Sequence, residues 1–507
     1  MPVRSESETM PDTNLVTLTF IGYILLMLVI GLVAYRRTAD LSDYLLGGRQ
    51  LGRWVTALSA EASDMSGWLL LGLPGYAYLS GLEAGWIALG LLVGTYFNWK
   101  LVASRLRVYS ELAGDALTLP EFLEQRFADH SRVLRVVAAL FVLLFFTFYT
   151  SSGLVASGKL FESVFGIDYR SAVLVGALVV VAYTFLGGFL AVSWTDLVQG
   201  CLMFVALLAV PMAVLETQGG VQTSVTALRD ANPALLDPLS DRAGAPLSLA
   251  AVTSLLGWGL GYFGQPHILA RFMAIRQARD IESARAIAVT WVAVTLLCSV
   301  LVGVAAVGYL PTPLTGSDSE KVFIEMVAAL FHPLLAGICL AAILAAIMST
   351  ADSQLLVASA ALSDDFYKGL LRPQAGAAEL VWMGRLAVLG LAALAIFLAM
   401  DPERKVLELV AYAWAGFGAA FGPTILLSLY WRRMNRNGAL AGILTGGITV
   451  IWWGQLQGGT FGLFDLYEII PGFGFSTLAI LLVSLATAPP EARIQQQFEN
   501  LFGQPAV

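Results

Sequence analysis

The chain has 507 residues, of which 58% are hydrophobic and only 13% are charged. Soluble domains carry about 25% charged residues, so this composition excludes a soluble globular protein. The net charge of −7 identifies no partner, and the three cysteines lie in apolar runs, where they indicate neither a disulfide framework nor a metal cluster.

Apolar stretches of about 20 residues, the length that crosses a bilayer as a helix, recur along the chain. The segment up to Asn14 is polar and acidic and lacks the pattern of a signal peptide, so the first stretch is expected to remain a span. We predict an all-α polytopic membrane protein with thirteen spans, whose odd number places the two ends on opposite sides. The spans are expected at about 15–35, 54–79, 83–102, 135–158, 171–188, 194–215, 248–270, 287–309, 334–359, 381–400, 406–430, 438–456 and 468–487.

Positive charge is divided unequally between the predicted loops. Most of the 29 lysines and arginines fall on one side, which holds Arg36, Arg37, Arg49 and Arg53, the loops 100–135, 271–285 and 432–436, and the C-terminal tail. The positive-inside rule makes that side cytoplasmic. We therefore expect a plasma-membrane protein with its N-terminus outside and its C-terminus in the cytoplasm.

Three polar connections have their own predictions. The loop 103–134 is expected to carry a short helix that begins at Leu119, and the region 216–247 is expected to be a surface loop because it is rich in glycine and proline. The tail at 488–507 is expected to be amphipathic or disordered.

The second span carries the sequence LSAEASDMSGWLLLGLPG over residues 58–75, with two carboxylates, Glu61 and Asp64. An ionised carboxylate at mid-bilayer depth costs about 2.5–3.5 kcal/mol, and a bound cation offsets that cost. Ser59, Ser63 and Ser66 share one helical face, and the glycines and Pro74 allow the helix to break. The alternative is structural, with hydroxyls bonded to their own helix and Asp64 as a helix cap.

A second interruption, GWGLGYFGQP, lies at residues 257–266 in the seventh span. Five spans separate the two interruptions, so the second enters the membrane from the opposite side. Paired interruptions in inverted repeats are typical of transporter binding sites. We predict inverted five-helix repeats at 54–215 and 248–430, preceded by a first span and inner loop at 15–53 and followed by two extra spans at 438–487.

The ninth span contains AAIMSTADSQ, which places Ser349, Thr350, Asp352 and Ser353 in an otherwise apolar helix. Adjacent hydroxyls, with the small residue Ala346 one turn earlier, suit a hard monovalent cation such as sodium. The alternative is helix packing by small and hydroxyl residues. Asp352 is interpreted as a residue behind the ligands or as a gate.

Trp258, Tyr262 and Pro266 recur every four residues in the seventh span, which suggests an aromatic wall for a small amphiphilic solute. Tyr149 is a further candidate for substrate contact, although packing explains these aromatic residues equally simply. Arg49 and Asp196 each have a simple structural interpretation, Arg49 as a membrane anchor and Asp196 as a helix cap. In the alternative interpretation, Arg49 lies near the inner mouth, pairs with an acid and forms a gate. His267 and Arg271 follow near the end of the same span.

The sequence lacks a nucleotide-binding P-loop, a zinc HExxH motif and a nucleophile elbow. No enzyme activity is therefore expected, and uphill transport would have to use an ion gradient. The alternatives to a transporter are a channel and a membrane sensor that uses this fold.

Six motifs together resemble the solute:sodium symporter family over about residues 15 to 490. They are DYLLGGR (43–49), LSAEASDMSGWLLLGLPG (58–75), FLGGFLAVSWTD (185–196), GWGLGYFGQPHILARFM (257–273), AAIMSTADSQLL (345–356) and AYAWAGFGAAFGP (411–423). The resemblance implies a leucine-transporter-like fold and uptake of L-proline coupled to sodium, with no protein partner. Symport of another solute, or coupling to protons through Glu61, Asp64 or Asp352, are the alternatives.

The resemblance also implies roles for individual residues. The implied sodium ligands are Ala62, Met65, Ala346, Ser349 and Thr350, supported by Asp64. Substrate contact is implied for Ser66, Tyr149, Trp258, Tyr262 and Pro266, and gating or coupling for Arg49, Ser59, Asp196 and Asp352. The chain departs from the family pattern where Glu61 replaces a glycine and Asp352 a small uncharged residue.

Overall fold

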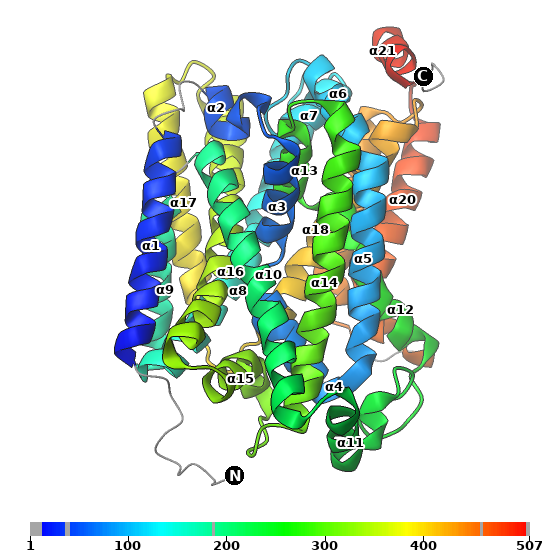
Figure 1. Cartoon of the computed structure of the whole chain (residues 1–507). Coiled ribbons are helices and arrows are strands. Elements are labelled where there is room, and N and C mark those ends of the chain that lie inside the picture. Colours follow the sequence, from blue (N-terminus) through cyan, green and yellow to red (C-terminus); the bar gives the residue numbers. More distant parts are fainter. Residues whose placement is uncertain (1–12, 36–40, 185–187, 457–459, 503–507) are drawn as a thin grey trace.

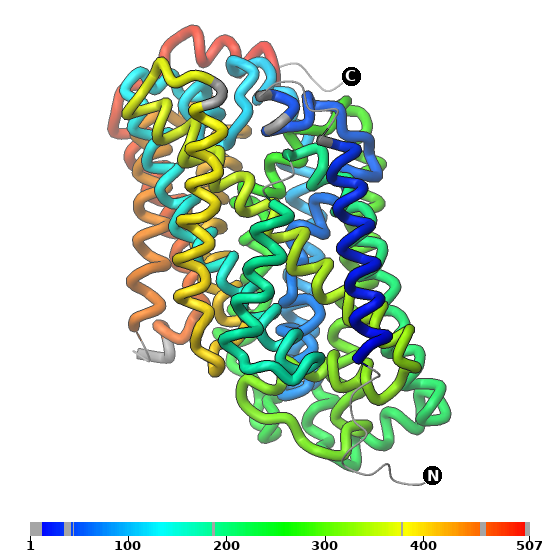
Figure 2. Tube along the Cα trace, turned by 90° about the vertical axis from the view of Figure 1, so that its left-hand side faces the viewer, coloured from blue at the N-terminus to red at the C-terminus, as the bar shows by residue number. Residues whose placement is uncertain are grey.

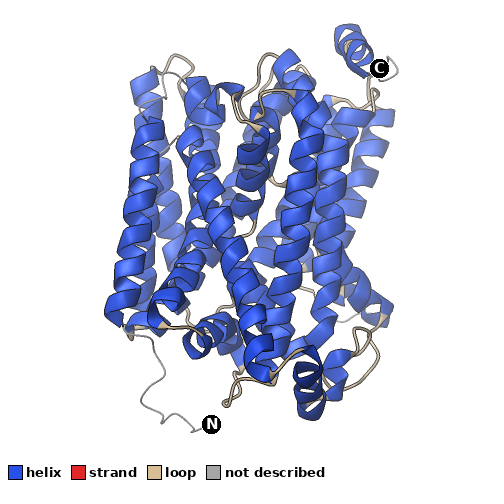
Figure 3. Cartoon of the chain, viewed as in Figure 1, coloured by secondary structure: helices blue, strands red, loops and turns tan. Residues whose placement is uncertain are grey.

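The computed structural model describes residues 13–35, 41–184, 188–456 and 460–502. Within these ranges the regular structure is helical, and β-type pairing is limited to the isolated bridges Leu51–Ile275 and Ser240–Pro246. The long helices run roughly side by side between two faces of the molecule (Figures 1 and 3). We call these the α21 face, at the top of Figure 1, and the α11 face, at the bottom.

Eleven segments form the continuous long helices of the bundle, and each coincides with a predicted span. They are α1 (Thr13–Tyr35), α5 (Gly85–Asn98) with its continuation through η4 (Trp99–Ala103) into α6 (Ser104–Leu112), α8 (Val133–Phe165), α9 (Tyr169–Thr184), α10 (Phe189–Gln218), α14 (Ile281–Val307), α16 (Pro333–Ala360) with its continuation η9 (Ala361–Leu371), α17 (Ala377–Ala399), α18 (Val406–Tyr430), α19 (Arg436–Trp453) and α20 (Ile469–Ala486).

The other two predicted spans are interrupted, as the sequence predicts. The first consists of α3 (Arg53–Asp64), η2 (Trp68–Gly72) and α4 (Leu73–Ser80), and the second of α12 (Leu249–Gly257), η6 (Trp258–Gly264) and α13 (Pro266–Ala274). In Figure 1 the first runs from the α21 face toward the α11 face, and the second runs the opposite way.

Nine of the described helical segments are long and apolar enough to cross a membrane. All thirteen predicted spans overlap described helices, but their number as membrane crossings stays a prediction. The predicted span 171–188 reaches residues 185–187, which lie outside the described part of the chain, as do Arg36 and Arg37. The described chain starts at the α11 face and α21 lies at the other, which agrees with an odd number of crossings (Figure 1).

Short helices cover the two faces. They are α2 (Leu41–Leu46), η1 (Gly47–Arg49), α7 (Leu119–Arg126), α11 (Val221–Ala231), η5 (Pro233–Leu236), η7 (Ala278–Asp280), η8 (Gly316–Lys321), α15 (Val322–Leu330), η10 (Thr460–Asp465) and α21 (Ala492–Phe502). The helix expected at Leu119 is confirmed as α7, whose start is capped because the Thr118 side chain accepts a hydrogen bond from the Glu121 N–H. Between 216 and 247 the structure adds α11 and η5 to the predicted surface loop.

In the C-terminal tail, Ala492–Phe502 form an amphipathic helix that packs against the α21 face, and residues 503–507 lie outside the described part of the chain. Ile494 and Phe498 of α21 are buried, and the Phe498 ring lies 6.4 Å from the ring of Tyr109 in α6. The Gln497 side chain donates to the backbone carbonyl of Leu112. Figure 2 shows α19 and α20 at one side of the bundle and α1 at the other.

The interrupted helix η6 packs tightly between α5 and α18 because all three carry glycine at their contacts. A Cβ atom on Gly94 would overlap the backbone of Gly259, and one on Gly259 would overlap the carbonyl of Gly90. Gly90 and Gly94 form a GxxxG pattern, which permits close approach of helices in membranes. This contact fixes the position of Trp258, the neighbour of Gly259.

We expect Gly94→Val to lower the unfolding temperature strongly, since the added side chain must displace backbone and overpacking costs about 1–3 kcal/mol or more. Gly390→Ala is the control, because a Cβ there meets nothing within 4 Å. The measurement is thermal unfolding of the detergent-solubilised protein. Equal stability of the two variants would contradict the close α5–η6 contact.

Candidate functional site

The break after α3 leaves the carbonyl of Ala62 without its usual helical partner. Met65 has φ −80° and ψ 74°, and the N–H of Ser66 bonds to the carbonyl of Asp64 instead of to Ala62. The Ala62 carbonyl oxygen instead accepts a hydrogen bond of 2.7 Å from the Ser349 hydroxyl of α16, with the Thr350 hydroxyl at 3.5 Å. A helix of the second half of the chain is thus bonded directly to the break.

Four of the five predicted ion ligands therefore come together. Ser349 also donates to the Ala346 carbonyl at 3.1 Å, so backbone and hydroxyl oxygens of Ala62, Ala346, Ser349 and Thr350 share one buried place. Met65 is buried at the end of α3, but among the hydrogen bonds of the described ranges none joins it to α16. This set of neutral oxygens suits a hard monovalent cation. Among the described residues, no group of three or more His, Cys, Asp or Glu side chains is arranged to hold a metal ion.

Asp64 joins the break to the second interrupted helix. Its Oδ2 accepts a hydrogen bond of 2.8 Å from the Tyr262 hydroxyl, and its backbone carbonyl accepts one of 2.9 Å from the Tyr149 hydroxyl. The side-chain Oδ1 has no hydrogen-bond partner although it is buried. Two of the predicted substrate residues therefore bond to Asp64, Tyr262 of η6 to its carboxylate and Tyr149 of α8 to its backbone carbonyl.

The aromatic wall predicted from Trp258 and Tyr262 is larger in the structure. The Trp258 ring lies 6.3 Å from Trp68 and 5.5 Å from Tyr467, and the Tyr262 ring stands edge-on to Trp414 at 5.0 Å. The Trp414 indole donates to the Trp258 carbonyl at 2.7 Å. Sequence analysis did not predict Trp68, Trp414 and Tyr467 as part of this wall. Trp68 lies in the family motif at 58–75 and Trp414 in that at 411–423, and these positions were the signal that could have identified them.

The two remaining substrate candidates lie at the breaks themselves. Ser66 follows α3, and its hydroxyl is an acceptor 3.4 Å from the Trp68 N–H. Pro266 is the first residue of α13, where a proline needs no N–H partner. Both residues are buried.

A buried charged network connects four helices beside the predicted ion ligands. Asp196 of α10 accepts a hydrogen bond of 2.6 Å from Ser59 and pairs with Arg271 of α13 at 3.2 Å. Arg271 also donates to Ser59 and to Ser353 of α16. All four side chains are buried. The alternative that Asp196 caps a helix is wrong, because Asp196 lies inside α10 and the N-cap position is Gly188.

The two unexpected carboxylates each have one partner. Asp352 accepts a hydrogen bond of 2.7 Å from Thr184 of α9, and Glu61 accepts one of 2.9 Å from the Trp99 indole. The second oxygen of each carboxylate has no hydrogen-bond partner. Asp352 therefore points to α9, whereas Ser349 and Thr350 point to α3.

Arg49 lies in a separate contact at the α21 face. Its guanidinium pairs with Asp115 at 2.9 Å and donates to the carbonyls of Met273 and Ala116 at 2.7 and 2.8 Å. Burial lowers the pKa of Arg49 from its usual value, and Asp115 opposes that shift. Arg49 ties η1 to the end of α13, away from the predicted ion ligands, and its gating role stays a prediction.

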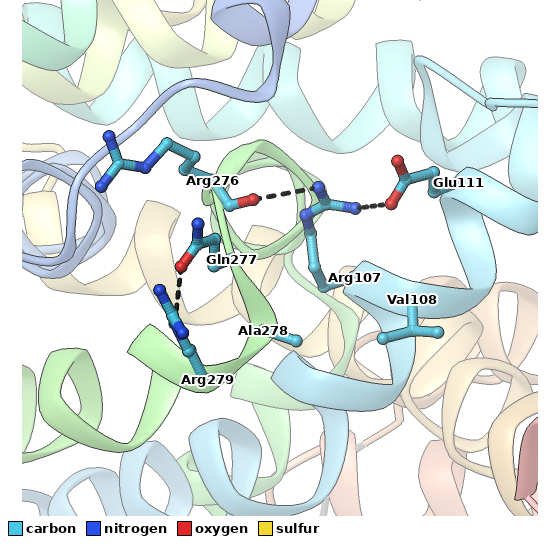
Figure 4. Close-up of a pocket in the computed structure, with 7 residues that line it drawn as sticks. All are labelled: Arg107, Val108, Glu111, Arg276, Gln277, Ala278 and Arg279. Atoms are coloured by element: carbon cyan, nitrogen blue, oxygen red, sulfur yellow. Dashed lines mark hydrogen bonds and ion pairs between the residues drawn. The ribbon is translucent and has the colours of Figure 1, made fainter.

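A cavity of about 490 Å³ opens beside this contact and includes none of the predicted site residues. Figure 4 shows Arg107 between Glu111, at 2.6 Å, and the carbonyl of Arg276, with Arg279 bonded to Gln277. The Arg107 guanidinium also donates to the carbonyl of Ile275, which fixes α6 against the end of α13.

Two interrupted helices in opposed directions, with buried polar groups at both breaks, define a secondary transporter of the membrane. The sequence pattern of the sodium:solute symporter family matches residues 44–446. The chain belongs to this family, and it is a transporter, not an enzyme.

Several known proteins are similar to the whole chain. Sodium/proline symporters of Salmonella typhimurium and Escherichia coli are each 52% identical over 485 residues, which is 95% of this chain and 95% of each relative. A sodium-coupled sialic acid symporter, solved in a substrate-bound outward-open state, matches with a TM-score of 0.77 over 94% of this chain and 99% of its own. At 18% identity that structure supports the fold alone, and it agrees with the predicted leucine-transporter-like class.

We expect Arg271→Leu to destabilise the protein by about 3–5 kcal/mol, because Asp196 is left buried without its counter-ion. The double variant Arg271→Leu, Asp196→Asn should lose clearly less free energy of unfolding than the sum of the losses in the two single variants. The exposed pair Arg404–Asp401, treated in the same way, is the control. Thermal unfolding in detergent measures all variants, and additive losses at Arg271 and Asp196 would contradict the buried pair.

Proposed function

We propose that the chain takes up L-proline across the plasma membrane together with sodium. The observation that carries this proposal is the contact between the freed Ala62 carbonyl and the hydroxyls of α16. The names of the relatives at 52% identity over 95% of the chain support proline as the solute.

Sodium is proposed to bind among Ala62, Ala346, Ser349 and Thr350, with Met65 as a further ligand and Asp64 nearby. When a cation enters, the Ser349 hydroxyl turns its oxygen toward the ion instead of donating to Ala62. The buried carboxylate of Asp64, which has one unpaired oxygen, favours a positive charge at this place. Ion binding then stabilises the break in α3 and, through Tyr262 and Tyr149, the two elements that reach Asp64.

Proline is a zwitterion with an apolar ring, and both parts find a counterpart at the breaks. The ring suits the faces of Trp258 and Tyr262. The carboxylate suits the N-terminus of α13 at Pro266, and the ammonium suits backbone carbonyls near Ser66. Tyr149 and Tyr262, which are proposed to contact the substrate, both bond to Asp64, which is proposed to support the ion. Asp64 therefore connects the proposed substrate site to the proposed ion site.

Two contacts are proposed as gates. On the α21 side of the two breaks, Arg49 and the buried Ser59–Asp196–Arg271 network join η1, α3, α10 and α13. On the α11 face, the buried pair Lys159–Glu320 joins α8 to η8, and Glu320 also accepts the N–H groups of Val406 and Leu407 at the start of α18. Alternating access requires that each set opens while the other is closed. Asp352 is proposed to couple α16 to α9 through Thr184.

The orientation and the repeat boundaries belong to the same proposal. The arginine-rich elements of the α21 face favour a cytoplasmic location for that face, with the N-terminus outside. The repeats are proposed at 54–215 and 248–430, since the interrupted helices open each range and run in opposite directions (Figure 1).

A sodium gradient supplies enough energy for concentrative uptake. One charge moving through about 100 mV is worth about 2.3 kcal/mol, and a roughly tenfold gradient adds about 1.4 kcal/mol. The sum of about 3.7 kcal/mol per ion permits roughly 500-fold accumulation.

The test is uptake of labelled L-proline by proteoliposomes under an inward gradient of sodium, potassium or protons. We expect transient accumulation with sodium alone. Accumulation with protons alone would move the coupling to Glu61, Asp64 or Asp352, whose carboxylates each have an unpaired oxygen. Absence of proline uptake under all gradients would overturn proline as the substrate.

A further inference from the structure

One buried side chain in the second interrupted helix has no partner for either of its polar atoms. The side chain of His267 is fully buried, and neither Nδ1 nor Nε2 has a hydrogen-bond partner. A buried polar group without a partner costs free energy, and such groups are uncommon in folded proteins. The mechanism proposed above makes no use of this imidazole.

The imidazole lies beside a proposed substrate residue. Its ring centre is 6.1 Å from the ring of Tyr149, edge-on, and 5.7 Å from the ring of Phe146. The hydroxyl of the same Tyr149 is bonded to the carbonyl of Asp64. His267 is thereby placed near the point where α8, the break of α3 and the start of α13 meet.

The start of α13 has further unpaired groups. Gln265 occupies the N-cap position, yet its side chain does not cap the helix. Its Nε2 donates to the carbonyls of Gly261 and Trp414 at 3.1 and 3.4 Å, while its Oε1 has no hydrogen-bond partner although it is buried. A helix N-terminus favours an anion, and a neutral imidazole carries one N–H that can donate to the same anion.

We propose that His267 binds the carboxylate of the amino-acid substrate through a ring N–H, at the N-terminus of α13. This inference rests on the proposed function, because it takes the substrate to be a zwitterionic amino acid. The unpaired Oε1 of Gln265 is an acceptor only, so it suits the ammonium of the same molecule. His267 thus distinguishes substrates with a free carboxylate from those without one.

The experiment compares wild type, His267→Leu and His267→Gln in sodium-driven proteoliposome uptake of labelled L-proline. Unlabelled L-proline and L-prolinamide, which lacks the carboxylate, serve as competitors. We expect His267→Leu to raise the KM for proline by at least about tenfold, equivalent to about 1.4 kcal/mol. Inhibition by prolinamide should change much less, and the sodium concentration for half-activation should stay near the wild-type value. His267→Gln, which restores an N–H, should recover part of the preference for proline.

His130→Gln is the matched control, because the His130 side chain is 84% exposed at the α21 face. An unchanged KM in His267→Leu, or an equal loss for proline and prolinamide, would overturn the inference while proline uptake by wild type still stands. Absence of proline uptake by wild type would instead overturn the proposed function. If the leucine variant does not fold, His267→Phe, which also lacks a side-chain N–H, decides: a proline-to-prolinamide ratio and a KM for proline identical to wild type contradict the role.

Discussion

The arrangement depends on one backbone carbonyl, that of Ala62. In an uninterrupted helix this oxygen would accept the N–H of Ser66, but the turn at Met65 directs that N–H to Asp64. A free carbonyl inside a membrane protein needs another donor or a cation. Ser349 supplies the donor from α16, so this hydrogen bond holds the break in the first half of the chain to an intact helix of the second half.

The charged groups around this contact differ in how far their charges are compensated. Asp196 and Arg271 compensate each other, and Ser59 and Ser353 satisfy further groups of the same network. Asp64 accepts hydrogen bonds, but within the described part of the chain it forms no ion pair with a cationic side chain. Because an ionised carboxylate is costly in this environment, we propose that a cation bound at Ala62 and Ser349 lowers that cost. Tyr149 and Tyr262 connect Asp64 to α8 and η6.

Sequence analysis succeeded where the signal is local. The glycines and Pro74 at the first break, the hydroxyl pair Ser349–Thr350 and the run around Trp258 each stand out against an apolar background, and the structure brings them together. Sequence analysis did not predict the partners, since Asp196 with Arg271, Asp352 with Thr184 and Glu61 with Trp99 each join elements far apart in the chain. The partners of Arg49 were not predicted either, because they come from the α6–α7 connection and the end of α13. The sequence does not show that the imidazole of His267 is buried without a hydrogen-bond partner, because both properties depend on the folded structure.

Direct sodium binding tests the central claim without any transported solute. Equilibrium binding of radioactive sodium to the purified protein would be compared between wild type and the double variant Ser349→Ala, Thr350→Ala. Thr295→Ala is the control, because that buried hydroxyl bonds to the preceding turn of its own helix. The account predicts saturable binding by wild type and the control, with affinity reduced at least about tenfold in the double variant. Unchanged sodium affinity in the double variant would contradict an ion site between α3 and α16.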